Sequence, residues 1–273
     1  MSIKHFSGFC AVALAIAAAS CSGNSSSESS DSVVAIDTTI ISELAGDDSI
    51  PANPPVETEK FEKSKGNNSL EIEYPVSGND ALLKSIRTWM SEQLGDTYSG
   101  DLNNAKGFFK HYAALLGTDP ELSEEGGYSK DEFEVEYQNN LIVTYEHSSI
   151  INEGGPQNVK ETYGTTFLLE DGSIFTKKCI ASYKDIQPLI VEGLKGFFKV
   201  KSDADLLARL NGQKSTSSIS APAMNPWIEE DGVAFSYTPY EIDSDPNLTP
   251  HFTIPFAKIL PYLTEEGRRF IQQ

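Results

Sequence analysis

The chain has 273 residues, of which 39% are hydrophobic, and its formal net charge is −19. That hydrophobic content is enough for a packed core, so the composition excludes a chain that is disordered throughout. The excess of acidic residues argues against a nucleic-acid-binding protein, because contacts to phosphate groups need clustered Lys and Arg. It suits a cationic partner instead, and attraction to such a partner over long range would depend on salt.

Residues 1–20 have the pattern of a secretory signal peptide. Lys4 precedes a run of small and apolar residues at 8–19, which is too short to span a bilayer. The run ends in Ala18-Ala19-Ser20-Cys21, which resembles a lipobox, where the cysteine receives a lipid before cleavage. The sequence therefore predicts a lipoprotein of the cell envelope, anchored through lipid on Cys21, with the outer membrane as its home in a two-membraned cell. The alternative is an ordinary secretory cleavage site at which Cys21 has no role.

Residues 21–66 are predicted to form a disordered, lipidated tether. The segment is rich in Ser and acidic residues, contains three prolines, and has no sustained hydrophobic period. Such a segment cannot bury enough apolar area to offset its ordering entropy. Three Asp-Ser/Thr triplets in it resemble a sequon for O-glycosylation of exported bacterial proteins, although an acidic, Ser/Thr-rich stretch also produces such triplets by chance. The resemblance would put sugar on Ser32, Thr38 and Ser49.

The folded part is predicted to begin near Asn68, with a first half at residues 67–151. Alternating apolar and polar residues indicate strands, and apolar residues at helical spacing indicate helices. The elements expected here are a strand at 70–74, a helix capped by Asn79 and ending before Gly95, a helix at 101–116, and strands at 133–137 and 141–147.

The second half covers residues 152–273. The elements expected here are a strand at 159–170 turned by Asp171-Gly172 into 173–175, helices at 183–199 and 202–210, strands at 233–237 and 251–255, and helices at 256–263 and 265–271. Helices around an antiparallel sheet predict an α+β fold. Cys179 is the one cysteine of this folded part, and its apolar neighbours predict a small buried hydrophobe rather than a reactive thiol.

Four stretches of the second half carry a resemblance to a known family. They read NEGGPQ at 152–157, YGTTFLLEDGSIF at 163–175, FSYTPYEI at 235–242 and FTIPF at 252–256. They resemble the family known as domain of unknown function 3298, whose relatives include the lysozyme-sensing extracellular domain of RsiV-type anti-sigma factors. Relatives carry His where Gln157 stands, so any metal or proton-transfer role of that His is not implied here. The loop at 243–250 also differs, so lysozyme binding does not carry over directly.

The last two strands are expected to place Tyr240 and His251 on either side of the loop at 243–250. That loop would expose Asp243 and Asp245, and acids on a projecting loop suit a basic partner because exposed charges steer the encounter. These four residues are the predicted partner-binding site. The competing interpretation is that Tyr240 is a buried aromatic and that the loop merely faces solvent.

The sequence lacks the motifs of common hydrolases and nucleotide-binding proteins, such as G-x-S-x-G, S-x-x-K, H-E-x-x-H and the P-loop. Residues 243–247 begin like a calcium loop, but Leu248 and Ile254 stand where Gly and Glu are needed. Residues 229–231 are predicted to be an exposed charge run rather than a glycosidase pair.

No metal, cofactor or enzymatic activity is therefore predicted. The sequence favours a monomeric, non-enzymatic binding lipoprotein that captures a cationic, lysozyme-like protein or a cell-wall glycan. The alternative is an enzyme that acts on peptidoglycan or another envelope glycan.

Overall fold

The computed structural model describes residues 55–119, 122, 126–210, 213–242, 245 and 248–271. Cys21, the three predicted glycosylation residues (Ser32, Thr38 and Ser49) and Asp243 lie outside the described residues. Within the described part, no helix is both long enough and apolar enough to cross a membrane.

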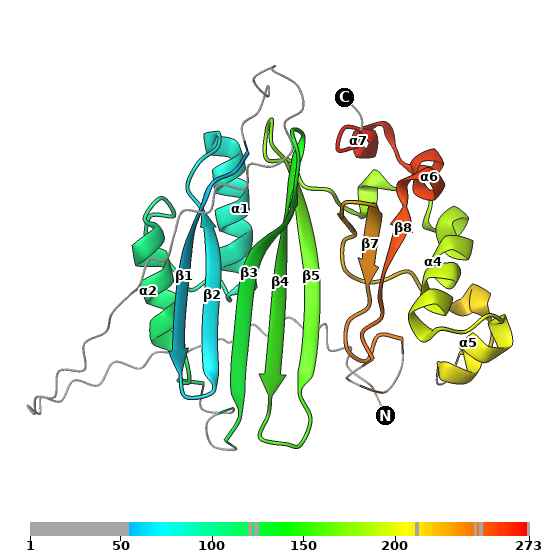
Figure 1. Cartoon of the computed structure of the whole chain (residues 1–273), viewed down its shortest axis with the longest axis horizontal. Helices are drawn as coiled ribbons and strands as arrows, with labels where there is room; N and C mark the ends of the chain where they lie inside the picture. Colours follow the sequence, from blue (N-terminus) through cyan, green and yellow to red (C-terminus); the bar gives the residue numbers. More distant parts are fainter. Residues whose placement is uncertain are drawn as a thin grey trace, which may run out of the picture.

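The N-terminal lobe is a five-stranded sheet in the order β1-β2-β3-β4-β5, with α1 and α2 on one of its faces (Figure 1). Its elements are β1 (Thr58–Lys65), β2 (Asn68–Pro75), α1 (Asp80–Gln93), α2 (Ala105–Leu115), β3 (Tyr128–Gln138), β4 (Ile142–Asn152) and β5 (Val159–Leu168). The C-terminal lobe lies beside β5 and is built on a smaller sheet in the order β6-β7-β8 (Figure 1). Its elements are η1 (Lys177–Cys179), α4 (Tyr183–Phe198), α5 (Asp203–Arg209), η2 (Thr216–Ser218), β6 (Trp227–Ile228), β7 (Gly232–Ser236), β8 (His251–Pro255), α6 (Phe256–Ile259), η3 (Leu260–Tyr262) and α7 (Glu265–Arg268).

The predicted α+β class is confirmed, but the large sheet is mixed rather than antiparallel. β2 and β3 pair in parallel, with Ile72 opposite Phe133, whereas the other neighbours pair antiparallel. The parallel pair arises because the chain leaves β2, passes through α1 and α2 on one face, and returns to lie beside β2. Such a crossover brings the next strand back in the same direction.

The prediction of disorder up to residue 66 is wrong for residues 58–65, which form the edge strand β1. Phe61 is its one large apolar residue; it is fully buried and its ring stacks on Phe109 at 5.2 Å between centroids. A two-residue turn joins Lys65 to Asn68, its partner in the register, and Gly66 has a φ of 62°. Glycine meets the positive φ that such hairpin turns require.

Several predicted boundaries change for local reasons. α2 begins at Ala105 because the side chain of Asn104 accepts a hydrogen bond from the N–H of Gly107 and caps the helix. Residues 173–175 form no strand, and only a single bridge joins Ile174 to Phe167. The helix expected at 256–263 divides into α6 and η3 at Pro261.

Each lobe has its own hydrophobic core. One core fills the space between the sheet and α1 and α2, and it includes Phe61, Ile72, Phe133, Tyr145 and Phe167. The other lies within the C-terminal lobe and reaches Ile142 and Leu168 at one end of β4 and β5. β4 and β5 therefore supply side chains to both cores and hold the lobes together.

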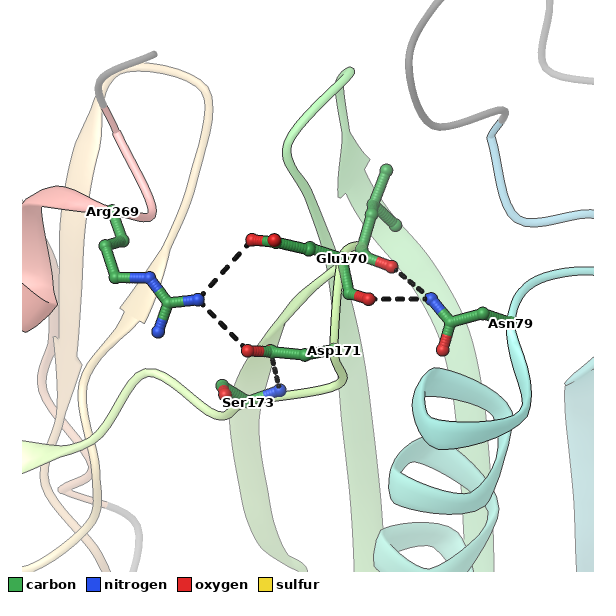
Figure 2. A network of polar contacts seen from close by, with 6 residues as sticks. Asn79, Glu170, Asp171, Ser173 and Arg269 are labelled. Carbon is green, nitrogen blue, oxygen red and sulfur yellow. Dashed lines mark hydrogen bonds and ion pairs between the residues drawn. The ribbon is translucent and has the colours of Figure 1, made fainter.

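A polar network joins the lobes near the end of β5 (Figure 2). Asn79, the N-cap of α1, accepts a hydrogen bond from the N–H of Leu82, while its Nδ2 donates to the carbonyls of Leu169 and Glu170 at 2.6 and 3.1 Å. From the other side, Arg269 contacts the carboxylates of Asp171 at 3.0 Å and Glu170 at 3.5 Å. The turn between β5 and η1 is thus held from both lobes.

Candidate functional site: an acidic sheet face

One face of the five-stranded sheet is covered by α1 and α2, and the opposite face carries acids. Along β3, Phe133 is buried under the helices while its neighbours Glu132 and Glu134 point the other way. The register extends this side across the sheet, because Glu62 lies opposite Glu71, Glu71 opposite Glu132, and Glu134 opposite Glu146. We define the acidic sheet face by Glu62, Glu71, Glu73, Glu132, Glu134, Glu136 and Glu146.

The carboxylates of this face repel one another. The pKa of Glu134 is raised by burial and then by the charges of Glu132, Glu146, Glu136 and Glu73. The pKa of Glu136, at the bulge of β3, is raised by burial and by the charges of Glu146 and Glu229. A positive charge placed against this face would relieve that repulsion.

Lysines offset part of the charge at two places on this face. At the far end of the strands, alternation puts Lys130 and Lys160 on the same side as Glu132, and both lie opposite Ile150.

At the β1 edge, the lysine is Lys60. Lys60 forms an ion pair with Glu71, and this hydrogen-bonded contact is the main reason that the pKa of Lys60 is raised. Lys60 lies opposite Glu73 in the register, so it neutralises the outer part of the face and leaves the β3–β4 part, around Glu134 and Glu146, more negative.

The C-terminal lobe borders the β5 side of this face. We call its residues Trp227, Ile228, Glu229, His251 and Thr253 the wall. His251 Nε2 lies 3.0 Å from Glu229 Oε1, and the His251 ring meets the Trp227 ring edge-on at 5.2 Å between centroids. Thr253 donates its hydroxyl proton to the other oxygen of Glu229. Burial alone would raise the pKa of Glu229, but the hydrogen bonds from His251 and Thr253 outweigh it and lower the pKa. The indole N–H of Trp227 also favours the ionised form, although its geometry falls short of a hydrogen bond.

The wall is joined to the sheet through β5 and β4. The Trp227 ring lies directly over Gly164, since a Cβ at that position would come 2.4 Å from the ring. Two threonine hydroxyls then bind the backbone of Ile228: Thr166 accepts from its N–H and Thr144 donates to its carbonyl, both at 2.7 Å. Gly164 lies opposite Glu146 in the register, so the wall rises next to the acidic sheet face.

The predicted charge run at 229–231 is corrected at its first residue. The Glu229 side chain is 21% exposed and engaged with His251 and Thr253, whereas Glu230 and Asp231 are exposed. Glu229 turns inward because it follows β6 directly and faces β8, where both of its partners lie.

The predicted partner-binding residues have different surroundings. Tyr240 is 66% exposed, which overturns the interpretation of a buried aromatic, and Asp245 is also exposed. The His251 side chain is 34% exposed, and its Nε2 is engaged by Glu229 in the wall. Thr249, just before β8, lies at the β5 edge of the large sheet, where its hydroxyl donates to the carbonyl of Lys160 at 3.5 Å.

Two further kinds of site concern the Cys179 thiol and groups of side chains that could bind a metal. Cys179 is buried, and burial raises the pKa of its thiol, which confirms the prediction of a small buried hydrophobe. In the described ranges, no group of three or more His, Cys, Asp or Glu side chains is arranged to hold a metal ion.

The acidic sheet face was missed by the sequence reasoning, although a signal for it exists. Residues 132–136 read Glu-Phe-Glu-Val-Glu and residues 71–73 read Glu-Ile-Glu, so within these two stretches every polar position is acidic. Alternation reveals that one side is acidic, but only the sheet order brings the acidic sides of four strands together.

The fold resembles solved structures, whereas no family model matches the sequence and no curated protein matches it. A crystal structure of a member of the DUF3298 family from Bacteroides fragilis matches with a TM-score of 0.57 and 19% identity, over 81% of this chain and 94% of that one. A DUF3298 family protein from Pseudomonas aeruginosa matches with a TM-score of 0.52 and 14% identity, over 81% of this chain and 99% of that one. The chain therefore has the fold of these domain of unknown function 3298 structures, which confirms, for the fold, the resemblance seen in the sequence.

Proposed function

We propose that this chain is a non-enzymatic binding module, anchored to the cell envelope through lipid on Cys21, that captures a basic protein on the acidic sheet face. The observation that supports the proposal is the register, which gathers glutamates on one side of four neighbouring strands. There, burial and then the neighbouring negative charges raise the pKa of Glu134 and Glu136. Like charges on neighbouring strands cost stability, and folding does not require them. Binding of a basic partner would remove this repulsion between the carboxylates, and the free energy released would contribute to the affinity.

The shape of the face suits a macromolecule. Carboxylates project from four neighbouring strands, about 4.8 Å apart, so several cationic side chains can be met at once. Charges at such a surface mainly speed the encounter and fix the orientation of the partner, and their effect weakens with salt.

The proposal is tested by binding of lysozyme, as a basic probe, at low and physiological salt. We expect a variant with Glu134→Gln, Glu136→Gln and Glu146→Gln to bind about tenfold or more weakly, because close charge pairs are lost. The matched control carries Glu92→Gln, Glu153→Gln and Glu265→Gln, three exposed acids outside the acidic sheet face. It removes the same net charge and should change the affinity about twofold at most. Equal weakening of both variants would mean that net charge alone, and no particular face, attracts the probe.

The same assay has a pH signature. A basic partner binds the ionised carboxylates, so affinity falls as pH falls through their pKa values. Because the pKa of Glu134 lies above the ordinary value of 4.5, affinity should begin to fall at a higher pH than ordinary glutamates would give. The triple variant should lose this early part of the pH dependence.

An enzyme acting on peptidoglycan is the second candidate, and one observation favours it. Glu229 orients the partly exposed ring of His251, the arrangement used by general bases. Release of soluble sugar or peptide from purified peptidoglycan, abolished by His251→Gln, would replace the binding proposal.

The proposed anchor has a separate test. The substitution Cys21→Ser should move the protein from the membrane fraction to the soluble fraction.

A further inference from the structure

Tyr240 combines an unusual backbone with an exposed ring. Its φ is 63°, and the other non-glycine residues with positive φ in the described part are Asp96 and Lys199, which follow the ends of α1 and α4. The left-handed conformation is unfavourable for a bulky side chain and is tolerated best by Gly and Asn. At 66% exposure, the Tyr240 ring recovers little of this cost through burial.

The turn that carries Tyr240 is held by its neighbours. The carboxylate of Glu241 accepts hydrogen bonds from the N–H of Ala223 at 2.5 Å, the N–H of Thr238 at 2.9 Å and the Thr238 hydroxyl at 3.0 Å. Tyr237 and Ile242, on either side of the turn, are both buried. With these side chains directed inward, the Tyr240 ring is presented to solvent on a fixed backbone.

The group that Tyr240 would meet follows from the chemistry of its ring. The face of an aromatic ring attracts cations, such as a guanidinium or an ammonium group. Glu241 follows Tyr240 directly, but its carboxylate is hydrogen-bonded within the turn and interacts with the charge of Lys177. The strained and exposed ring of Tyr240 is therefore the group suited to an Arg or Lys side chain of a basic partner.

We propose that Tyr240 is a contact residue whose ring stacks against an Arg or Lys side chain of the basic partner. This inference rests on the proposed function and adds a second contact point, outside the acidic sheet face. It implies that Tyr240 is retained at the expense of stability, so that binding and stability should respond to its replacement in opposite directions.

The experiment measures thermal stability and affinity for lysozyme at low salt. Tyr240→Asn relieves the backbone and removes the ring, so the melting temperature should rise while the affinity falls about two- to fivefold. Tyr240→Phe keeps the ring and should keep the affinity within about twofold. Phe197→Asn, which removes a ring that is 41% exposed on α4, is the control and should leave the affinity unchanged.

Each result that differs from these expectations contradicts a particular part of the proposal. Unchanged affinity of Tyr240→Asn, in a protein whose acidic-face triple variant does bind more weakly, would remove Tyr240 as a contact and leave the proposed function standing. An equal loss in Tyr240→Phe would assign the contact to the hydroxyl group and overturn ring stacking. A lower melting temperature of Tyr240→Asn would overturn the strain argument. A wild-type protein that fails to bind lysozyme at low salt would overturn both proposals for this class of partner.

Discussion

At the scale of single residues, position 164 requires a glycine, for a reason that the sequence of β5 does not reveal. A glycine inside a strand weakens it, and it often marks the close approach of another group. Here that group is the Trp227 ring, which belongs to the other lobe. The absence of a side chain on β5 is what allows the wall to sit on the sheet.

Replacement of Gly164 by Ala should therefore loosen the contact between the lobes. The new Cβ would lie 2.4 Å from the ring, and Trp227 would have to move. We expect a loss of about 1–3 kcal/mol in the free energy of unfolding, measured by chemical denaturation. Gly155→Ala is the control, because no atom lies within 4 Å of the Cβ position there. A Gly164→Ala protein as stable as this control would show that the ring shifts at no cost.

The sequence allowed some of these residue roles to be predicted and not others. Asn79 as a helix cap and Cys179 as a buried thiol follow from their near neighbours in the chain, and both predictions are confirmed. The contact of Gly164 with Trp227 and the pairing of Glu229 with His251 join distant segments, so no local pattern contains them.

At the scale of elements, Asn79 does two separable things for α1. Its Oδ1 caps the helix, while its Nδ2 binds the carbonyls of Leu169 and Glu170. Asn79→Asp should keep the cap but lose both donated bonds, and it adds a negative charge close to Glu170. We expect this change to cost about 1–2 kcal/mol in urea denaturation.

The cap of α2 provides the comparison for that experiment. Asn104→Asp keeps the bond from the N–H of Gly107 and should change stability by less than about 0.5 kcal/mol. Similar losses in the two variants would mean that Asp is simply a poorer cap in this protein and that the contact with the β5 turn contributes nothing.

Among the elements, alternation predicted β2, β3 and β4 correctly but not the direction of their pairing. Period-two patterns indicate which side of a strand is buried, and they are the same for parallel and antiparallel neighbours. β1 was missed because Phe61 is its one large apolar residue, although the Gly66-Asn67 pair was a turn signal. Such patterns also do not show which strands are neighbours, so the acidic sheet face could be recognised only in the folded structure.

At the scale of the whole molecule, the position of β1 fixes where the folded part must begin. A chain that starts at residue 55 keeps β1, and with it the stacking of Phe61 on Phe109. A chain that starts at residue 68 loses Phe61 from the core and frees the edge of β2, which is a site for aggregation. Loss of a buried Phe side chain costs about 3–5 kcal/mol, so we expect the shorter chain to melt well below the longer one and to elute partly as aggregate in size-exclusion chromatography. Equal melting temperatures would mean that β1 packs on the domain without stabilising it.

β1 also determines how the molecule would bear mechanical load. If the proposed anchor holds the N-terminus while a captured partner is pulled away, the tension first reaches Val56, which is buried and donates its N–H to Gln138 Oε1 on β3. It then passes to Thr58, the first residue of β1. β1 pairs only with β2, and Thr58 and Pro75 form the pair nearest to the load. A pull directed away from the sheet opens this ladder from one end, one pair after another, so little force is needed at each step. Once Val56 is released, the edge strand should therefore yield before the other strands of the sheet, and Phe61 would leave the N-terminal core with it. The domain would lengthen under strain while its acidic strands β2, β3 and β4 stay folded.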